Sequence, residues 1–404
     1  MESDTLKLTI CFTNFGPYHL ARLRALGISL RETGDELIAY EVAGREQRYP
    51  WVPLHGQEPF TWQTFFPTAT LETLAPSSCR QAISQHLDRD KPDAVAVVGY
   101  TRPESLALLS WAVRRSIPRI LMSESQAIDK PRVWWKEAVK ARRVQRFSSA
   151  LVGGPQHRDY LVQLGIPATK IAMGYNAVDH DQIRDRVDQH RTTTSGRPAH
   201  PRPYFLAVNR FVPEKNLARL LRAYAAYRAT VSSENCWDLV LCGDGPERDQ
   251  LQQLVNQLEL TPYVQFPGFL QERDLVAWWA GASAFVHPSL MEPWGLVVNE
   301  AAACRLPLLV STHAGCMETL VPEPIGTTGL RFNPTHDEAV TQSLVWMAAR
   351  TPAERAAMGQ RAELTAAEWG PARFAKGTLE ALAMAQQTRK PGKSAKVRAM
   401  RSVG

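Results

Sequence analysis

The sequence lacks the features that mark a membrane-spanning or secreted chain. None of its uninterrupted apolar runs approaches the roughly 18 residues that a transmembrane helix needs. Its first residues, MESDTLKLTICF, contain no basic stretch followed by an apolar one, as a secretion signal would. We therefore expect a cytoplasmic protein, with a peripheral position at the inner face of the membrane as the alternative.

Metal-binding and disulfide patterns are also missing. The six cysteines show no CxxC spacing, and several lie in apolar, strand-like contexts such as LVLCG at residues 239–243. Cysteines in such contexts are typical of buried thiols rather than of metal ligands or disulfides. We therefore predict no metal site built from them.

Surplus charge is nearly absent from the body of the chain. The net charge is +7, but the segment from residue 381 onward holds six basic residues and no acidic one, which leaves +1 for the rest. A groove that follows a nucleic-acid backbone needs its positive charge in the folded part, so we expect no nucleic-acid partner. Residues 389–404 are expected to form a basic disordered tail, and attraction to an anionic membrane surface is the sharper alternative.

What the sequence does have is a regular alternation of short apolar runs with longer helical patterns. Such alternation predicts an α/β protein with parallel sheets covered by helices. The predicted strands lie at residues 6–12, 36–42, 93–99, 119–123, 150–153 and 170–174 in the first half, and at 204–209, 238–243, 264–268, 283–289 and 307–311 in the second.

A polar segment between the two sets of strands predicts a domain boundary. Residues 185–203, DRVDQHRTTTSGRPAHPRP, contain three prolines and almost no apolar residue. Two open α/β domains joined by one polar connection enclose a cleft, and ligands bind such sheets beyond the carboxyl ends of the strands. We expect an N-terminal Rossmann-like domain over 1–187, a linker over 188–203, a C-terminal Rossmann-like domain over 204–370, a C-terminal helix over 371–388 and the tail.

The segment NRFVPEKNLARLLRAYAAY, residues 209–227, favours an anion site. It follows a predicted strand and is expected to open a helix at Pro213, where the missing N–H costs nothing. Arg210 and Lys215 flank the helix start near the positive end of its dipole, and two cations beside free amides suit a diphosphate. Solvated surface charge is the alternative for this pair taken alone. The helix is predicted to face the core with Leu217, Leu220, Leu221 and Tyr224.

A second strand, turn and helix follow at residues 239–251, LVLCGDGPERDQL. Gly243 and Gly245 let the backbone turn sharply around Asp244 and approach a ligand closely. The turn is no P-loop, because the GK[ST] ending is absent. It is a common turn by itself and becomes a candidate donor site only beside the basic pair.

A third unit, HPSLMEPWGLVVNEAAAC at residues 287–304, carries two carboxylates. Glu292 is predicted in the loop at the end of a strand, and Glu300 about one and a half turns into the next helix, on a side that can face the same ligand. Gly295 and Leu296 supply unpaired amides at the helix start. Because carboxylates accept hydrogen bonds from paired hydroxyls, the two acids suit a ribose diol and a sugar ring with a diphosphate between them.

Four segments in this order resemble retaining glycosyltransferases of the GT-B fold, specifically the C-terminal domain of family 4 with its E-x7-E signature. The resemblance lies in FLAVNRFVPEKN, LVLCGDGPERDQL, VQFPGFLQERDL and HPSLMEPWGLVVNEAAACRLPLLVSTHAGCMETL, and it is dense from about residue 204 to 335. It implies transfer of a sugar from a nucleotide donor, usually a UDP- or GDP-sugar. The acceptor would be held mainly by the N-terminal domain.

The resemblance also implies roles for individual residues. Arg210 and Lys215 would bind the diphosphate. Glu292 would contact hydroxyls of the donor sugar, and Glu300 would hold the ribose. The backbone around Phe269 and Leu270 would contact the base, and Arg305 stands where glycine is common in such enzymes.

The N-terminal half resembles the family only loosely. FTNFGPYHLARLRAL follows the first predicted strand, where such enzymes often have a glycine loop close to the donor phosphates and the acceptor, so Gly16 and His19 are the candidates. A helix cap or a surface position is the alternative for His19. Many relatives have a histidine at the end of the strand that here is ILMSESQ, and Ser123 and Glu124 stand there instead. Glu124 and His19 are therefore both candidates to act near the reacting carbon.

Residues 130–147, KPRVWWKEAVKARRVQRF, predict an amphipathic helix. Such a helix can lie on a membrane or guide an anionic acceptor. The simpler interpretation, which we favour from the sequence, is an ordinary helix whose apolar face packs in the core. One face has Val133, Trp134, Ala138, Ala141 and Val144, and the other has Lys136, Lys140, Arg142, Arg143 and Arg146.

We therefore expect a retaining hexosyltransferase that moves a sugar from a UDP- or GDP-sugar to a carbohydrate, lipid-linked or small-molecule acceptor in polysaccharide or glycoconjugate biosynthesis. No metal or other cofactor is predicted, because two DxD spellings, Asp88-Arg89-Asp90 and Asp179-His180-Asp181, lie at a helix end and at the linker rather than at a strand end. A sugar-nucleotide epimerase of the same fold and a non-catalytic sugar-nucleotide-binding protein are the alternatives.

Overall fold

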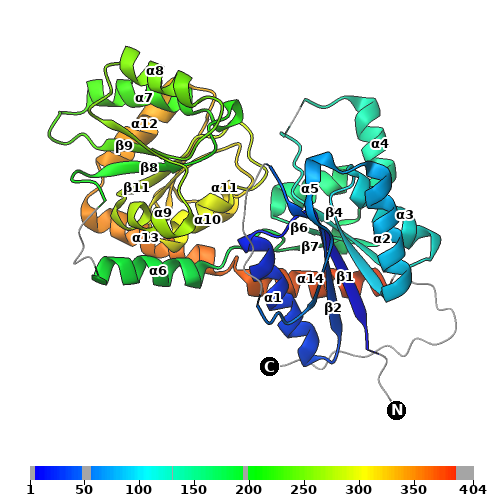
Figure 1. The fold of residues 1–404 in the computed structure, drawn as a ribbon. Helices are drawn as coiled ribbons and strands as arrows, with labels where there is room; N and C mark the ends of the chain where they lie inside the picture. The colour runs from blue at the N-terminus through cyan, green and yellow to red at the C-terminus, as the bar shows by residue number, and fades with distance from the viewer. Residues whose placement is uncertain (1–4, 48–55, 130, 194–198, 388–404) are drawn as a thin grey trace.

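The computed structural model describes residues 5–47, 56–129, 131–193 and 199–387. They form two parallel sheets in two domains that stand side by side in Figure 1. The predicted basic tail, 389–404, lies outside the described residues. None of the helices in these described residues combines the length and the apolar character that crossing a membrane requires.

Seven parallel strands form the N-terminal sheet, in the order β3-β2-β1-β4-β5-β6-β7. Successive residues of its first strand, Ile10 and Cys11, belong to different apolar cores, as expected for a strand buried on both faces. The strands are β1 (Lys7–Phe12), β2 (Glu36–Arg45), β3 (Thr61–Thr70), β4 (Ala94–Val98), β5 (Arg119–Ser123), β6 (Ser149–Val152) and β7 (Ile171–Met173). The helices are α1 (Pro17–Glu32), α2 (Pro76–Asp90), α3 (Pro103–Arg114), α4 (Trp134–Val144) and α5 (Pro155–Gln163), with short 3₁₀ turns at Leu71–Thr73 and Ala168–Lys170.

Six parallel strands form the C-terminal sheet, in the order β10-β9-β8-β11-β12-β13. The strands are β8 (Tyr204–Val208), β9 (Asp238–Cys242), β10 (Val264–Gly268), β11 (Ala284–His287), β12 (Leu308–Ser311) and β13 (Gly329–Phe332). The helices are α7 (Leu217–Thr230), α8 (Arg248–Gln257), α9 (Glu272–Gly281), α10 (Leu296–Ala303), α11 (Met317–Leu320), α12 (Asp337–Ala348) and α13 (Pro352–Ala367).

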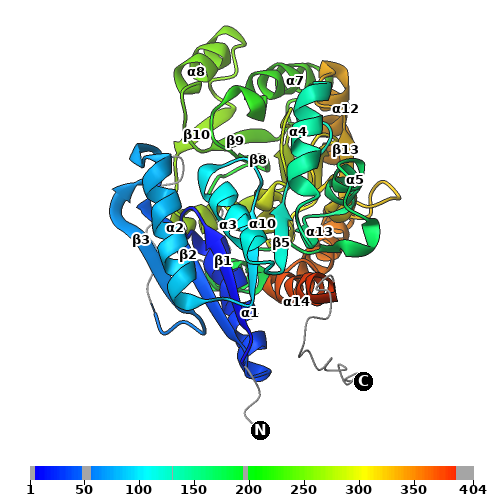
Figure 2. The same ribbon diagram turned by 90° about the vertical axis from the view of Figure 1, so that its right-hand side faces the viewer.

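The chain passes between the domains twice. Helix α6 (His180–Thr193) packs against α9, α10 and α13 of the C-terminal domain. The last helix, α14 (Pro371–Gln387), returns to the N-terminal domain and lies beside α1, which Figures 1 and 2 both show. Its Phe374 and Leu382 share an apolar core with Leu8 of β1. The C-terminal helix thus completes the N-terminal core, and the predicted linker 188–203 begins inside α6 rather than in an extended segment.

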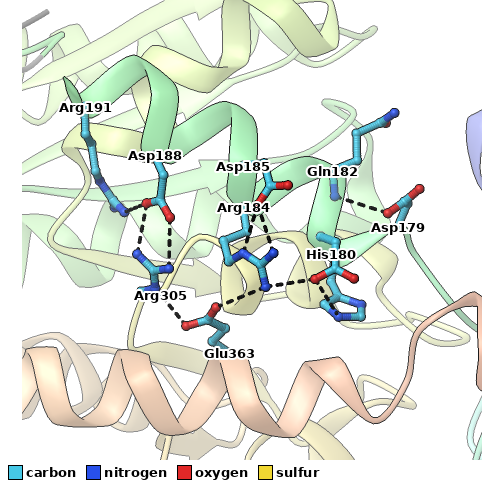
Figure 3. Close-up of polar contacts among 10 residues, drawn as sticks. Asp179, His180, Gln182, Arg184, Asp185, Asp188, Arg191, Arg305 and Glu363 are labelled. Carbon is cyan, nitrogen blue, oxygen red and sulfur yellow. Dashed lines mark hydrogen bonds and ion pairs between the residues drawn. The ribbon is translucent and has the colours of Figure 1, made fainter. Parts of the chain in front are cut away.

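A network of ion pairs fastens α6 to the C-terminal domain (Figure 3). Arg305 forms a bidentate pair with Asp188, with both nitrogen–oxygen distances 2.9 Å, and a 2.7 Å pair with Glu363 of α13. Its backbone φ is 60°, the left-handed region that favours glycine. Glycine would adopt this conformation without strain, whereas the arginine supplies two charge-assisted hydrogen bonds to α6 and one to α13, which together hold α6 in place.

Each predicted strand is present, and two further strands were missed. Strand β3 contains Pro67, which a sheet tolerates here because β3 is an edge strand, and β13 has only four residues. The helix predicted from Pro213 begins at Leu217 instead, because Pro213–Lys215 form a 3₁₀ turn that ends at Asn216 with a φ of 60°. The core residues predicted for α7 are buried, and the six cysteines are free and buried as expected.

The favoured interpretation of residues 130–147 was wrong for the first half of the helix. Val144 packs in the core with no exposed surface, but Trp134 is 82% exposed and Val133 is 36% exposed. The apolar face predicted to be covered by the domain is therefore largely open.

Candidate active site

Glu292 lies beyond the carboxyl end of β11 and is enclosed by two partners. Its Oε2 atom contacts Lys215 Nζ and lies 2.9 Å from His287 Nε2. Burial acts to raise the pKa of Glu292, but the hydrogen bond from His287 and the charge of Lys215 outweigh it and lower the pKa to about 2. Glu292 is therefore ionised, and the structure brings together two residues that the sequence had assigned to separate parts of the donor.

His287 is the member of this cluster that the sequence analysis missed. It ends β11 and has no exposed surface. Since the ionised Glu292 can only accept, His287 Nε2 carries the hydrogen, and Nδ1 has no hydrogen-bond partner among the described residues. Burial lowers the pKa of His287, so the ring is neutral. Its place at the end of a predicted strand was the only signal available.

Glu300, in α10, has a different environment from Glu292. Its Oε1 atom accepts a 2.5 Å hydrogen bond from the Tyr18 hydroxyl of α1, which belongs to the N-terminal domain. Burial raises the pKa of Glu300 to about 7, although the Tyr18 hydrogen bond opposes the change. Burial also raises the pKa of Tyr18, so the phenol keeps its hydrogen. The hydrogen bond spans the two domains and was not predicted.

Arg210 and the glycine turn lie on neighbouring loops. A guanidinium nitrogen of Arg210 lies 3.6 Å from a carboxylate oxygen of Glu214, and about a third of the Arg210 side chain is exposed (34%). Gly243 has a φ of 135°, and a Cβ there would lie 1.8 Å from the carbonyl oxygen of Asn209. The close approach predicted for the glycine is therefore made to the loop that carries Arg210. Asp244 accepts hydrogen bonds from the Gly245 amide at 2.7 Å and from Arg248 at 3.1 Å, so its carboxylate is used within its own turn.

The start of α10 and the end of β10 supply the remaining donor-side candidates. Gly295 precedes α10 with a φ of 101°, and Leu296 is the first helical residue. The Val298 amide donates to the Gly295 carbonyl oxygen at 2.8 Å, so the first-turn amides that remain candidates for an anion are those of Leu296 and Val297. Phe269, just after β10, is 54% exposed, and Leu270 beside it is partly buried.

Gly16 and His19 form the start of α1. The Gly16 amide donates to His19 Nδ1 at 3.1 Å, and the imidazole packs 4.5 Å from the ring of Phe12. Burial, with the charge of Arg22, lowers the pKa of His19 to about 3. The neutral ring accepts at Nδ1 and therefore carries its hydrogen on Nε2. His19 thus acts as a helix cap, the alternative named for it, and keeps one donor for another partner.

Glu124 follows β5 and lines a hollow of about 190 Å³ at the carboxyl ends of β4 and β5. Its Oε1 atom accepts a 2.5 Å hydrogen bond from Asn176 Nδ2. The hollow contains polar groups suited to an acceptor hydroxyl, and one wall comes from the C-terminal domain. Its lining residues are Val98, Gly99, Met122, Ser123, Glu124, Ser125, Asp129, Tyr175 and Pro293.

The N-terminal domain holds the backbone around Glu292. Gln126 Nε2 donates to the carbonyl oxygen of Glu292 at 2.9 Å, and His157 Nε2 lies 2.7 Å from that of Pro293. Because a carbonyl only accepts, His157 Nε2 carries the hydrogen, while its Nδ1 accepts from the Gly154 amide at 3.2 Å. The loop that carries the donor-side carboxylate is therefore positioned by both domains.

Residues 190–365 match the family described as Glycosyl transferases group 1. The chain is 31% identical over 143 residues to the O-antigen chain mannosyltransferase B of Escherichia coli, which covers 35% of this chain and 36% of that protein. It is 30% identical over 189 residues to a GDP-mannose-dependent alpha-(1-6)-phosphatidylinositol monomannoside mannosyltransferase of Mycolicibacterium smegmatis, covering 45% of this chain and 48% of the relative. The matches thus span between a third and a half of these two relatives.

Solved structures resemble the whole chain. HepE of Anabaena in complex with UDP and glucose has a TM-score of 0.67 at 18% identity, covering 94% of this chain and 99% of its own. Sucrose-phosphate synthase from Thermosynechococcus elongatus has a TM-score of 0.70 at 20% identity, covering 95% and 98%. The predicted GT-B fold, two Rossmann-like domains with parallel sheets, is confirmed. The family match and the named relatives show that the C-terminal part of the chain is similar to glycosyltransferases.

Proposed function

We propose that this protein transfers a sugar from a UDP- or GDP-sugar to an acceptor hydroxyl with retention of configuration at the anomeric carbon. The observation that carries the proposal is the cluster of Lys215, His287 and Glu292 at the carboxyl end of β11. A nucleotide-sugar donor is supported by a relative named for GDP-mannose and by a structural neighbour that holds UDP and glucose.

The donor-side roles follow from charge and hydrogen-bonding capacity. Arg210, Lys215 and the first amides of α10 stabilise the diphosphate. Lys215 divides its charge between the diphosphate and Glu292, whose free lone pairs accept from hydroxyls of the donor sugar. Glu300 accepts from the ribose diol, and the backbone around Phe269 and Leu270 meets the base.

The reaction that we propose breaks the bond between the anomeric carbon and the diphosphate oxygen. The acceptor oxygen bonds to that carbon on the same face, and its proton passes to the departing diphosphate. Most of the protein's contribution is stabilisation of the charge that develops on this leaving group. No proton needs to pass through a carboxylate in this scheme, so Glu292 can remain ionised throughout.

The acceptor side contains the neutral imidazole of His19 and the carboxyl group of Glu124, which accepts a hydrogen bond from Asn176. We infer that the acceptor hydroxyl enters the hollow beside Glu124, and that His19 donates from Nε2 to the donor or acceptor. The carboxylate of Glu124, already bound by Asn176, orients that hydroxyl rather than taking its proton. The cytoplasm remains the proposed location, and we propose no metal requirement.

An epimerase is not favoured, because the named relatives are transferases and synthases. A first experiment is a thermal-shift screen with UDP, GDP, ADP and their sugars, because a ligand that binds the folded state raises its melting temperature in proportion to ln(1 + [L]/Kd). We expect UDP or GDP, with its sugar, to give the largest shift. No shift with any nucleotide would overturn the proposal.

Turnover separates the transferase from a non-catalytic binding protein. We expect slow hydrolysis of the donor sugar without acceptor, measured as release of UDP or GDP, and faster release once an acceptor is supplied. Nucleotide binding without any release of sugar would assign the protein to the binding class instead.

A further inference from the structure

The first turn of α4 exposes an unusual amount of apolar surface. Trp134 is 82% exposed, Trp135 is 52% exposed, and Ile128 in the preceding segment is 55% exposed. Single exposed apolar residues are normal in soluble proteins, but neighbouring exposed tryptophans mark an interaction site. We call this the α4 surface and define it by Ile128, Val133, Trp134, Trp135, Lys136, Val139, Arg142, Arg143 and Arg146.

The exposure is not the result of a loosely attached helix. Val144 anchors the last turn in the core. Tyr160 of α5 donates a 2.6 Å hydrogen bond to Glu137, which also pairs with Lys140 at 2.7 Å and with Arg132 at 3.5 Å. One face of α4 is therefore fixed to α5, and Figure 1 shows the helix projecting at the upper end of the N-terminal domain.

The charges on the outer part of α4 are of one sign. Glu137 is paired with the inward cations Lys140 and Arg132. For Arg142, Arg143 and Arg146, no ion pair with an acid occurs among the described residues. The outer face is thus apolar in its first turn and cationic in its last, with Lys136 beside the ring of Trp135.

The α4 surface begins in the chain segment that lines the hollow proposed for the acceptor. Ser125 and Asp129 line that hollow, and Ile128 lies between them in sequence with its side chain exposed. The same segment leads into α4. A surface bound to α4 would therefore lie near the hollow proposed for the acceptor.

We propose that the α4 surface docks on an anionic lipid bilayer. Tryptophans bury their rings at the level of the lipid head groups while keeping the indole N–H near water, and arginines at the other end meet the negative surface charge. A nucleic acid or an acidic protein would satisfy the arginines but would leave the aliphatic Ile128 and Val139 without a partner. If the proposed function holds, the docked orientation presents the hollow to an acceptor carried by a lipid.

Co-sedimentation of the full-length protein with vesicles tests the proposal. We expect binding to vesicles of equal parts phosphatidylcholine and phosphatidylglycerol at low salt, and little binding to pure phosphatidylcholine. Because one basic residue near an anionic surface contributes about fivefold in binding, Arg142→Glu with Arg143→Glu should lower the affinity tenfold or more. Trp134→Ala with Trp135→Ala should lower it by a similar factor.

Two controls match these variants. Arg80→Glu with Arg222→Glu changes the net charge equally at exposed sites away from α4, and Leu364→Ala removes an apolar side chain that is 68% exposed. Both should bind vesicles like the unaltered protein. The tail of residues 389–404 is present in every variant. If the α4 variants bind normally, any binding belongs to another segment, and the proposal is overturned.

Failure of the unaltered protein to bind the anionic vesicles would overturn it as well. Binding of a short duplex DNA in place of vesicles, lost in the same arginine variants, would identify a nucleic-acid surface instead. Nucleotide affinity, measured by calorimetry without vesicles, keeps this test separate from the proposed function. Loss of vesicle binding with intact nucleotide affinity in the α4 variants is the expected combination.

Discussion

The two sides of the cleft differ in how they hold charge. On the C-terminal side, the carboxylate of Glu292 has a pKa lowered to about 2 and contacts both Lys215 and His287. On the N-terminal side, His19 is neutral with a pKa lowered to about 3, and Glu124 is bound by an amide. The difference matches a reaction in which charge develops on the leaving diphosphate while the acceptor hydroxyl needs only orientation.

Glu300 stands between these two environments. Glu300 belongs to the C-terminal domain, yet it accepts a hydrogen bond from the phenol of Tyr18 in the N-terminal domain. Burial raises the pKa of Glu300 to about 7. The comparison therefore predicts that substituting the donor-side cations has large effects on sugar transfer and that substituting Glu300 has intermediate effects on nucleotide binding. Substitutions of groups outside both sets should have small effects.

The largest effect is expected for the donor-side cations. Arg210→Ala and Lys215→Ala should each lower sugar transfer by roughly a hundredfold or more, the scale of one positioned electrostatic contact. Lys215→Ala also breaks a buried pair with Glu292, so it should lower the melting temperature, whereas the more exposed Arg210 should not. Arg219→Ala in α7, which breaks a surface pair with Asp337 of α12, is the matched control and should stay near full activity. If both variants transfer sugar at a near-normal rate, the diphosphate binds elsewhere.

Glu300→Gln should weaken nucleotide binding by about 1–3 kcal/mol, the range for a hydrogen bond to a charged group. The effect of this substitution on the stability of the folded protein depends on pH. The pKa of Glu300 is about 7 in the folded protein against 4.5 ordinarily, so the folded state binds more protons between these values and loses stability as pH rises through them. Glutamine does not ionise, so the variant should melt higher than the unaltered protein at pH 8 and no higher at pH 4.

Calorimetry with the nucleotide and melting curves at the two pH values check both statements. Glu318→Gln, at an exposed position of α11, is the control and should change neither quantity. Unchanged nucleotide affinity in Glu300→Gln would remove Glu300 from the site.

The features that could be predicted from the sequence are those that depend on residues close together in the chain. Strands of a parallel sheet are buried on both faces, so β4 was visible as an apolar run, and Glu292, Lys215 and Glu300 were placed by the order of strand, turn and helix. The missed contacts are non-local. Tyr18 and Glu300 are 282 residues apart, and only the closed cleft brings them together.

The error at α4 has a different cause. A helical pattern tells which residues share a face, but whether another element covers that face depends on the tertiary fold. Here α5 contacts α4 through Tyr160 and leaves Trp134 uncovered. His287 was missed for a related reason, since a histidine at the end of a strand gains its role only from the carboxylate that the loop folds back beside it.

A smaller effect on nucleotide affinity is expected for the hydrogen bond between Tyr18 and Glu300 across the cleft. If the ribose displaces Tyr18 from Glu300, Tyr18→Phe removes a hydrogen bond that binding would otherwise break, and nucleotide affinity should rise by up to about fivefold. The measurement belongs at pH 8.5, above the pKa of about 7 that Glu300 has in the unaltered protein. Tyr263→Phe is the control, because its ring packs on Arg228 away from the cleft. Weaker binding by Tyr18→Phe would mean that Tyr18 holds the ribose together with Glu300.

The smallest effect is expected for removal of divalent metal. The carboxylates of both DxD motifs already have hydrogen-bond or ion-pair partners within the protein. Asp88 accepts from Trp111 at 2.8 Å, and Asp90 from Tyr40 at 2.7 Å. Asp179 accepts from the Gln182 amide at the start of α6, as Figure 3 shows, and Asp181 pairs with Arg184 at 2.8 Å.

Asp88, Asp90 and Asp181 lie on helices and Asp179 directly precedes α6, so these four carboxylates are not at the carboxyl ends of the donor-side strands. Arg210, Lys215 and the amides of α10 can together balance a diphosphate without a metal ion. We therefore expect EDTA to leave the rate of transfer unchanged, and Asp88→Asn and Asp181→Asn to change it less than twofold, as measured by release of UDP or GDP. Activity that EDTA abolishes and Mn²⁺ restores would show that a metal carries the charge of the leaving group. The pairing of Lys215 with Glu292 would then be structural, and the contrast between the two sides of the cleft would need another explanation.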